Sequence, residues 1–164
     1  MLYTPKPCVI TEVIPQTYDT NTYVMEFVDE KDNAEFSCYL GQFNMLSVLG
    51  IGEAPISISS GPGDRGVFHH TVRNVGNVTG ALAKMRPGST IHVRGPYGRG
   101  WPMDALQGKD VLIVAGGIGL APLRPVLKAI SHDPRRFGNV EVLYGQGHPK
   151  TFCSCPSTMI GGTT

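Results

Sequence analysis

Three glycines follow a short apolar run in the C-terminal half of the chain, and their spacing could bring backbone N–H groups close to a phosphate. Val111–Val114 predicts a strand buried on both faces. Gly116, Gly117 and Gly119 then interrupt the run. A helix is expected directly afterwards over Pro122–His132, with its initial proline in the first turn. Glycines let the backbone approach a pyrophosphate, but an ordinary tight turn between a strand and a helix would show the same pattern.

Two segments in the N-terminal half combine an extended pattern with groups that could hold a flavin. Pro55–Ser57 offers backbone groups and the hydroxyl of Ser57, which can hydrogen-bond the polar edge of an isoalloxazine ring. In Thr71–Arg73 the arginine follows a strand and could neutralise a phosphate. Each segment also has a plainer interpretation, because the first is an ordinary strand by itself and a single arginine is more often a solvated charge.

A third candidate precedes a short helix expected over Gly80–Met85, which Pro87 and the glycine after it end. Thr79 is the expected N-cap of this helix. Its hydroxyl could instead donate to a pyrophosphate oxygen beside Gly76, where open N–H groups suit an anion. Capping requires no ligand, so it is the favoured role of Thr79 when this segment is considered alone.

These segments need a scaffold, and the first hundred residues predict a small antiparallel barrel. Short alternating segments are separated by turns rich in glycine and proline, as in closed β architectures. A polar turn is expected at Asp29–Asn33. The expected strands are Cys8–Ile14, Thr22–Val28, Phe43–Leu49, Pro55–Ser60, Val67–Asn74 and Thr90–Arg94.

The pattern changes near Gly108 from alternating strands to strand, helix, strand. Asn139–Tyr144 predicts a second strand parallel to Val111–Val114. The fold class expected is therefore a six-stranded antiparallel β-barrel followed by a partial α/β unit. We expect the barrel domain over residues 1–103, an incomplete nucleotide-binding domain over 108–150 and an irregular tail over 151–164. Tyr97 and Trp101, in the connection between them, could cover a flavin ring or pack the joint.

Composition excludes several classes of function. The 164 residues carry a net charge of +1, which gives no electrostatic case for binding nucleic acid or an anionic membrane. No apolar segment approaches the roughly 20 residues that span a bilayer, and the N-terminus lacks a signal-peptide pattern, so a cytoplasmic location is expected.

Cysteine and histidine give no metal site. Cys8 and Cys38 lie in strand-like patterns and are expected in the core, whereas Cys153 and Cys155 have no second pair to complete a metal site. His69 and its neighbour His70 would lie on opposite faces of a strand. No catalytic nucleophile with its base, and no pair of carboxylates, stands at a recognisable spacing, so we assign no catalytic residue and expect redox chemistry performed by a cofactor.

The order of the segments is more specific than any one of them. The series G-Q-F-N-M-L-S-V, G-E-A-P-I-S-I-S-S, V-R-N-V-G-N-V-T, G-P-Y-G-R-G-W, A-G-G-I-G-L-A-P-L-R-P-V-L and V-E-V-L-Y-G resembles the ferredoxin–NADP reductase superfamily. Within it, the chain is most similar to electron-transfer subunits: the gamma subunit of cytoplasmic nickel–iron hydrogenase (sulfhydrogenase), its relative in anaerobic sulfite reductase and the dihydroorotate dehydrogenase electron-transfer subunit. The resemblance runs from near the N-terminus to about Gly147.

This resemblance implies a flavoprotein that passes electrons between NAD(P)H as substrate, FAD and a [2Fe–2S] cluster, together with the other subunits of a redox complex. The resemblance implies four groups of cofactor contacts: a strand that holds the isoalloxazine ring, a second strand that contacts the flavin, a site for the pyrophosphate and a loop for the nicotinamide nucleotide. In that order they are Pro55, Ile56 and Ser57; Thr71, Val72 and Arg73; Gly76 and Thr79; and Gly116, Gly117 and Gly119.

Three departures from the family pattern bear on function. Ala54 stands where many relatives carry an arginine, which makes Arg73 the main expected cation for the flavin phosphates. A basic residue often found in relatives is missing after Val142–Tyr144, so the preference for NADH or NADPH stays open. The family pattern stops near Lys150, and with it the cluster cysteines, which indicates truncation. The alternative function is then a non-catalytic flavin-binding or subunit-docking module, and we expect poor reduction of the flavin by NADH.

Overall fold

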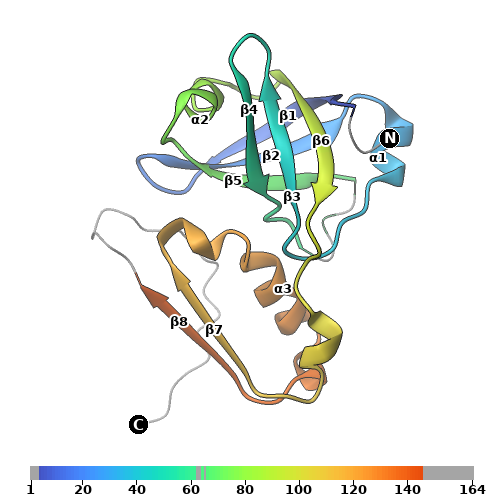
Figure 1. The fold of residues 1–164 in the computed structure, drawn as a ribbon, viewed down its shortest axis with the longest axis vertical. Helices are drawn as coiled ribbons and strands as arrows, with labels where there is room; N and C mark the ends of the chain where they lie inside the picture. Colours follow the sequence, from blue (N-terminus) through green and yellow to red (C-terminus); the bar gives the residue numbers. More distant parts are fainter. Residues whose placement is uncertain (1–3, 62–63, 65, 146–164) are drawn as a thin grey trace.

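The computed structural model describes residues 4–61, 64 and 66–145, which form a barrel and a smaller parallel sheet (Figure 1). Antiparallel pairing joins the barrel strands in the order β4-β3-β6-β1-β2-β5. The six strands are β1 (Lys6–Pro15), β2 (Thr20–Phe27), β3 (Phe43–Val48), β4 (Gly52–Ser57), β5 (Phe68–Arg73) and β6 (Thr90–Tyr97).

The edge strands β4 and β5 meet and close the barrel. An isolated antiparallel bridge pairs Ile58 with His70. The N–H of Ser59 donates to the carbonyl of His69 at 2.8 Å. The expected six-stranded antiparallel barrel is therefore confirmed, and its seam lies between the two strands predicted to contact a flavin.

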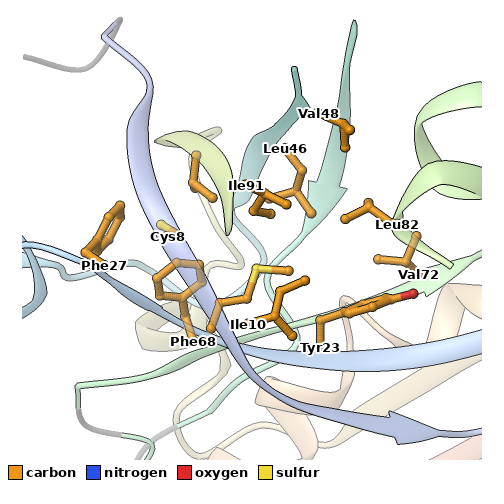
Figure 2. Close-up of a cluster of buried hydrophobic side chains, with 12 residues drawn as sticks. Cys8, Ile10, Tyr23, Phe27, Leu46, Val48, Phe68, Val72, Leu82 and Ile91 are labelled. Carbon is orange, nitrogen blue, oxygen red and sulfur yellow. The ribbon is translucent and has the colours of Figure 1, made fainter. Parts of the chain in front are cut away.

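The core fills the inside of this barrel with alternate residues of each strand. In β3, for example, Asn44, Leu46 and Val48 are buried, whereas the residues between them are partly exposed. Figure 2 shows the buried side chains converging from several strands and from the short helix beside them. The buried apolar cluster consists of Cys8, Ile10, Tyr23, Met25, Phe27, Leu46, Val48, Phe68, Val72, Leu82, Ile91 and Val93.

Two short helices accompany the barrel. Helix α1 (Glu30–Glu35) replaces the polar turn expected at Asp29–Asn33, because the carboxylate of Asp29 accepts the N–H of Lys31 at 2.8 Å and caps the helix. Helix α2 (Asn77–Leu82) begins earlier than expected, with Gly76 as its N-cap. The assignment of Thr79 as N-cap is therefore wrong. No helix in the described ranges is both long and apolar enough to cross a bilayer.

The second part of the chain contains strands β7 (Val111–Gly116) and β8 (Val140–Gly145), paired in parallel as expected. This part also contains helix α3 (Arg124–His132). Two short 3₁₀ turns precede the helix in the sequence and one follows it: η1 (Met103–Leu106), η2 (Gly117–Leu120) and η3 (Pro134–Arg136). The helix does not begin at Pro122, because the glycines first form η2 and a further turn. Pro125 is the proline in its first turn.

Only one face of β7 is covered in the described part of the chain. Ile113 packs with Val126 and Ile130 of α3. On the other face, Leu112 is 59% exposed and Val114 is 64% exposed. The expectation of a strand buried on both faces is therefore wrong here, since α3 packs on one side alone.

The two described cysteines differ in position. Cys8 belongs to the barrel core, as expected. Cys38 lies between α1 and β3, outside any strand and only partly buried, so its placement in a strand is wrong. Cys153 and Cys155 lie outside the described residues.

Candidate functional site

The barrel seam places the two predicted flavin strands side by side. Pro55, Ile56 and Ser57 belong to β4, and Thr71, Val72 and Arg73 belong to β5. Val72 belongs to the core cluster and Ile56 packs against it, so both side chains point into the barrel. A ligand on the outer face would meet their backbone groups and the alternate side chains, which are those of Ser57, Thr71 and Arg73.

The Thr71 side chain is already engaged by the protein. Thr71 is buried, and its hydroxyl lies 2.9 Å from that of Thr22 and 3.0 Å from that of Ser59. These three hydroxyls join β2, β5 and the segment that follows β4. Thr71 therefore stabilises the seam with its side chain and leaves its backbone as the group that a ring could approach.

Arg73 lies at the end of β5 beside the start of β2. Its Nε donates to Oδ2 of Asp19 at 2.7 Å, and its side chain is 42% exposed. Burial raises the pKa of Asp19, but the hydrogen bonds from Arg73, Thr17 and Thr20 outweigh it and lower the pKa overall. Asp19 is therefore ionised and pairs with Arg73. A phosphate at this position would share the Arg73 guanidinium with the Asp19 carboxylate.

Thr79 organises the loop before α2. Its hydroxyl accepts the N–H of Val75 at 3.0 Å and that of Gly76 at 2.8 Å, and donates to the carbonyl of Gly76 at 3.1 Å. As the third residue of the helix, it reaches back to the start in the manner of half a capping box. Helix α2, with Gly76 and Thr79 at its N-terminal end, packs beside β4, since a Cβ on Gly52, the first residue of that strand, would lie 3.7 Å from Cγ2 of Val78.

The glycine loop approaches the same seam from the second part of the chain. Gly116 ends β7, and Gly117 and Gly119 belong to η2, which packs against β5. Gly117 has φ +50°, a left-handed conformation that a side chain would strain. The hydroxyl of Tyr144 donates to its carbonyl at 3.3 Å. The structure therefore places all four predicted segments on or beside β4 and β5.

Three polar contacts fix the second part of the chain to the barrel. Nη1 of Arg124 donates to the carbonyl of Ser59 at 2.7 Å, next to the seam. Lys128 pairs with Asp64 at 2.9 Å. Nε1 of Trp101 donates to the carbonyl of Pro122 at 3.1 Å. The indole therefore packs the joint between the two parts of the chain, which is one of the two roles expected for it.

Sequence reasoning missed the buried polar pair behind the seam. His70 and Asn44 are both fully buried. Nδ1 of His70 lies 2.9 Å from the carbonyl oxygen of Ser57, and its Nε2 lies 3.1 Å from Nδ2 of Asn44. Burial lowers the pKa of His70 to about 4. The available signals were two adjacent histidines in an alternating strand, of which one must face inward, and an asparagine at a core position of β3.

The comparisons with known proteins match this architecture. Residues 7–101 match the family model of the oxidoreductase FAD-binding domain. Sulfhydrogenase 1 subunit gamma of Pyrococcus furiosus is 37% identical over 131 residues, which make up 80% of this chain and 45% of that protein. A probable dihydroorotate dehydrogenase B (NAD(+)), electron transfer subunit of Methanocella arvoryzae is 34% identical over 142 residues, 86% of this chain and 48% of that protein. The chain thus spans about half the length of these relatives.

Solved structures share the fold at lower identity. A ferredoxin-NADP+ reductase mutant from Plasmodium falciparum aligns with TM-score 0.75 and 19% identity, over 93% of this chain and 63% of that one. The flavohem-like FAD/NAD binding domain of nitric oxide dioxygenase from Vibrio cholerae aligns with TM-score 0.76 and 18% identity, over 90% and 65%. The barrel and the start of the parallel sheet are therefore arranged as in these proteins.

Proposed function

Because this chain belongs to the oxidoreductase FAD-binding domain family, we propose that it binds FAD along the seam between β4 and β5. We propose further that it serves as the flavin part of an electron-transfer subunit and connects NAD(P)H with an iron–sulfur centre of partner subunits. The names of its relatives support this role, since they include a sulfhydrogenase gamma subunit and electron transfer subunits.

The residues at the seam fit such a cofactor. Ser57 and the backbone of Pro55 and Ile56 would hydrogen-bond the polar edge of the ring system. The backbone of Thr71 and Val72 would line its other side, because both side chains are engaged within the protein. FAD, when bound, would supply hydride acceptance and the release of single electrons. The protein would orient the ring and exclude water from one of its faces.

Phosphate groups would be met by Arg73 and by the loop that Thr79 organises. The Arg73 guanidinium is partly exposed, so N–H groups beyond the contact with Asp19 can reach a phosphate. Gly76 leaves room for close approach, because only the Thr79 hydroxyl, at 4.0 Å, would meet a Cβ added there. Gly116, Gly117 and Gly119 would serve the pyridine nucleotide, which would then approach the flavin from the side of η2.

The adjacency of β4 and β5, with η2 packed against β5, is the observation that carries this proposal. It brings the two flavin strands and the glycine loop to one place. On the same basis, residues 1–103 would form the flavin-binding unit and residues 108–150 the beginning of the nucleotide-binding unit.

A non-catalytic flavin-binding or docking module is the second candidate. The exposed apolar face of β7, with Leu112 and Val114 uncovered in the described residues, favours it. A nicotinamide must be held about 3–3.5 Å from the flavin for hydride transfer, and misplacement by about 1 Å can cost roughly a hundredfold in rate.

Anaerobic mixing of the FAD-reconstituted chain with NADH separates the two candidates. Saturable bleaching of the flavin supports the electron-transfer role for this chain alone. A bound flavin that NADH does not bleach, but dithionite does, supports the module. A chain that binds no flavin contradicts both.

A further inference from the structure

The seam between the two flavin strands is held by a side chain as well as by the backbone. In the residues that the structure describes, the backbones of β4 and β5 are joined at the Ile58–His70 bridge and by the bond from Ser59 to His69. Ser57 is the last residue of β4 and lies one residue before Ile58. The imidazole of His70 reaches across to the carbonyl oxygen of Ser57, with Nδ1 at 2.9 Å. The fully buried histidine thus links β5 to the residue of β4 proposed to contact the flavin ring.

Its two partners define one tautomer of the neutral ring. A carbonyl oxygen can only accept, so Nδ1 of His70 carries the proton and donates to Ser57. Nε2 is then an acceptor, and Nδ2 of Asn44 donates to it at 3.1 Å. The opposite orientation of the amide would present Oδ1 to Nε2, and a neutral ring with its proton on Nδ1 has no second proton to give.

Asn44 is itself fixed in place. It is fully buried, and a Cβ on Gly95 would clash with its Oδ1 and press on its Cα. Gly95 has φ +142°, which further favours glycine at this position. Three strands therefore contribute to one arrangement: Ser57 of β4 accepts the Nδ1 proton of His70 in β5, and Asn44 of β3 donates to the Nε2 atom that this tautomer leaves as an acceptor. Asn44 Oδ1 has no hydrogen-bond partner among the described residues. Burial of this unpaired oxygen costs free energy that apolar side chains in the same place would not.

We propose that His70 is a positioning residue that fixes the spacing of the two flavin strands by donating a hydrogen bond from Nδ1 to the Ser57 carbonyl. This inference rests on the proposed binding of FAD at the seam. Its consequence is that loss of the donor changes how β4 presents Ser57 to the isoalloxazine ring. The flavin affinity and the flavin midpoint potential should both respond.

Three substitutions test the donor. His70→Leu removes it. His70→Asn keeps an amide N–H near the place of Nδ1, whereas the longer side chain of His70→Gln brings its amide nearer to Nε2. Phe68→Leu is the matched control, because Phe68 is a buried residue of the same strand whose ring packs against Phe27, Phe36 and the edge of the His70 ring but carries no hydrogen-bond donor. It changes the packing beside His70 and leaves the Nδ1 donor in place.

The measurements are FAD affinity, absorption spectrum and midpoint potential in each folded variant. We expect His70→Leu to weaken FAD binding about tenfold, as for one lost hydrogen bond, and to shift the potential. His70→Asn should restore most of both, His70→Gln should not, and Phe68→Leu should lower stability while leaving the potential unchanged.

Several outcomes would overturn the inference. Equal potentials in His70→Leu and Phe68→Leu would make His70 a core residue without a positioning role. If His70→Leu fails to fold, indistinguishable potentials of His70→Asn and His70→Gln lead to the same conclusion. Failure of the wild-type chain to bind FAD would instead contradict the proposed function and remove the basis of this inference.

Discussion

Replacement of Thr79 by valine should destabilise the loop before α2 without changing the shape of the side chain. The Thr79 hydroxyl accepts two backbone N–H groups, from Val75 and Gly76, and donates to one carbonyl. Thr79→Val removes this hydroxyl and puts a methyl group in its place. Both N–H groups lose their acceptor, and the buried position of Thr79 limits access of water from the side of the helix.

The magnitude follows from these contacts. Each neutral hydrogen bond contributes a net 0.5–1.5 kcal/mol or so. Val75 is 76% exposed and Gly76 is also exposed, so water can replace part of what is lost. We therefore expect the free energy of unfolding to fall by about 1–2 kcal/mol in Thr79→Val. Thr79→Ser keeps the hydroxyl and should lose less than half of that.

Urea denaturation followed by circular dichroism measures the free energy of unfolding, and FAD titration of the same samples measures the effect on the loop. The free energy of unfolding and the affinity for FAD should both be lower in Thr79→Val than in Thr79→Ser and wild type. A Thr79→Val protein within about 0.5 kcal/mol of wild type, the scatter typical of a neutral surface change, would refute the loop-organising role of this hydroxyl.

Three further predictions concern acid stability, the flavin phosphates and the open sheet face. Because burial lowers the pKa of His70 to about 4, below its ordinary value near 6.5, the unfolded chain takes up a proton first as the pH falls. The free energy of unfolding should then drop by about 2 kcal/mol between pH 7 and pH 5 from this group, and urea titrations should show a flatter profile for His70→Asn. Arg73→Ala should weaken FAD about tenfold, the loss of one charge-assisted contact, and more than Arg124→Ala, which loses a bond to the Ser59 carbonyl instead; equal affinities by fluorescence titration would exclude Arg73 from the phosphate site. We expect the apolar face of β7, on which Val114 is 64% exposed among the described residues, to cause self-association, and Val114→Ser should reduce that association in analytical ultracentrifugation; a monomeric wild-type chain or unchanged association would show that this face plays no such part.

Local patterns predicted the elements of the fold well where one residue spacing decides the outcome. Alternation located the strands of the barrel, and Val111–Val114 followed by glycines located β7 and η2. The start of α3 was misplaced because Pro122 and Pro125 both suit a first helical turn, and only the tertiary course of the glycine loop selects the second. The cap at Asp29 was overlooked because a six-residue helix has too short a pattern to distinguish it from a turn.

The site was predictable in outline and not in its contacts. The segments around Ser57, Arg73 and Gly117 come together at the seam, but their hydrogen-bond partners are far away in the sequence. Asp19 lies 54 residues from Arg73 and Asn44 lies 26 from His70, so no spacing rule could connect them. The hydrogen bonds of Thr71 with Thr22 and Ser59 likewise depend on how β2, β5 and the segment after β4 meet.

FAD binding at the β4–β5 seam is the central claim, and an equilibrium titration with a blocking variant tests it most directly. The purified chain is titrated with FAD beside Ser57→Trp, which would place an indole on the outer face of β4, and beside Lys31→Trp on the exposed surface of α1. We predict saturable binding with a flavin absorption spectrum for wild type and Lys31→Trp, and binding weakened at least tenfold for Ser57→Trp, the loss of about 1.4 kcal/mol or more. A folded wild-type chain that binds no FAD, or equal affinity in all three proteins, would contradict the account.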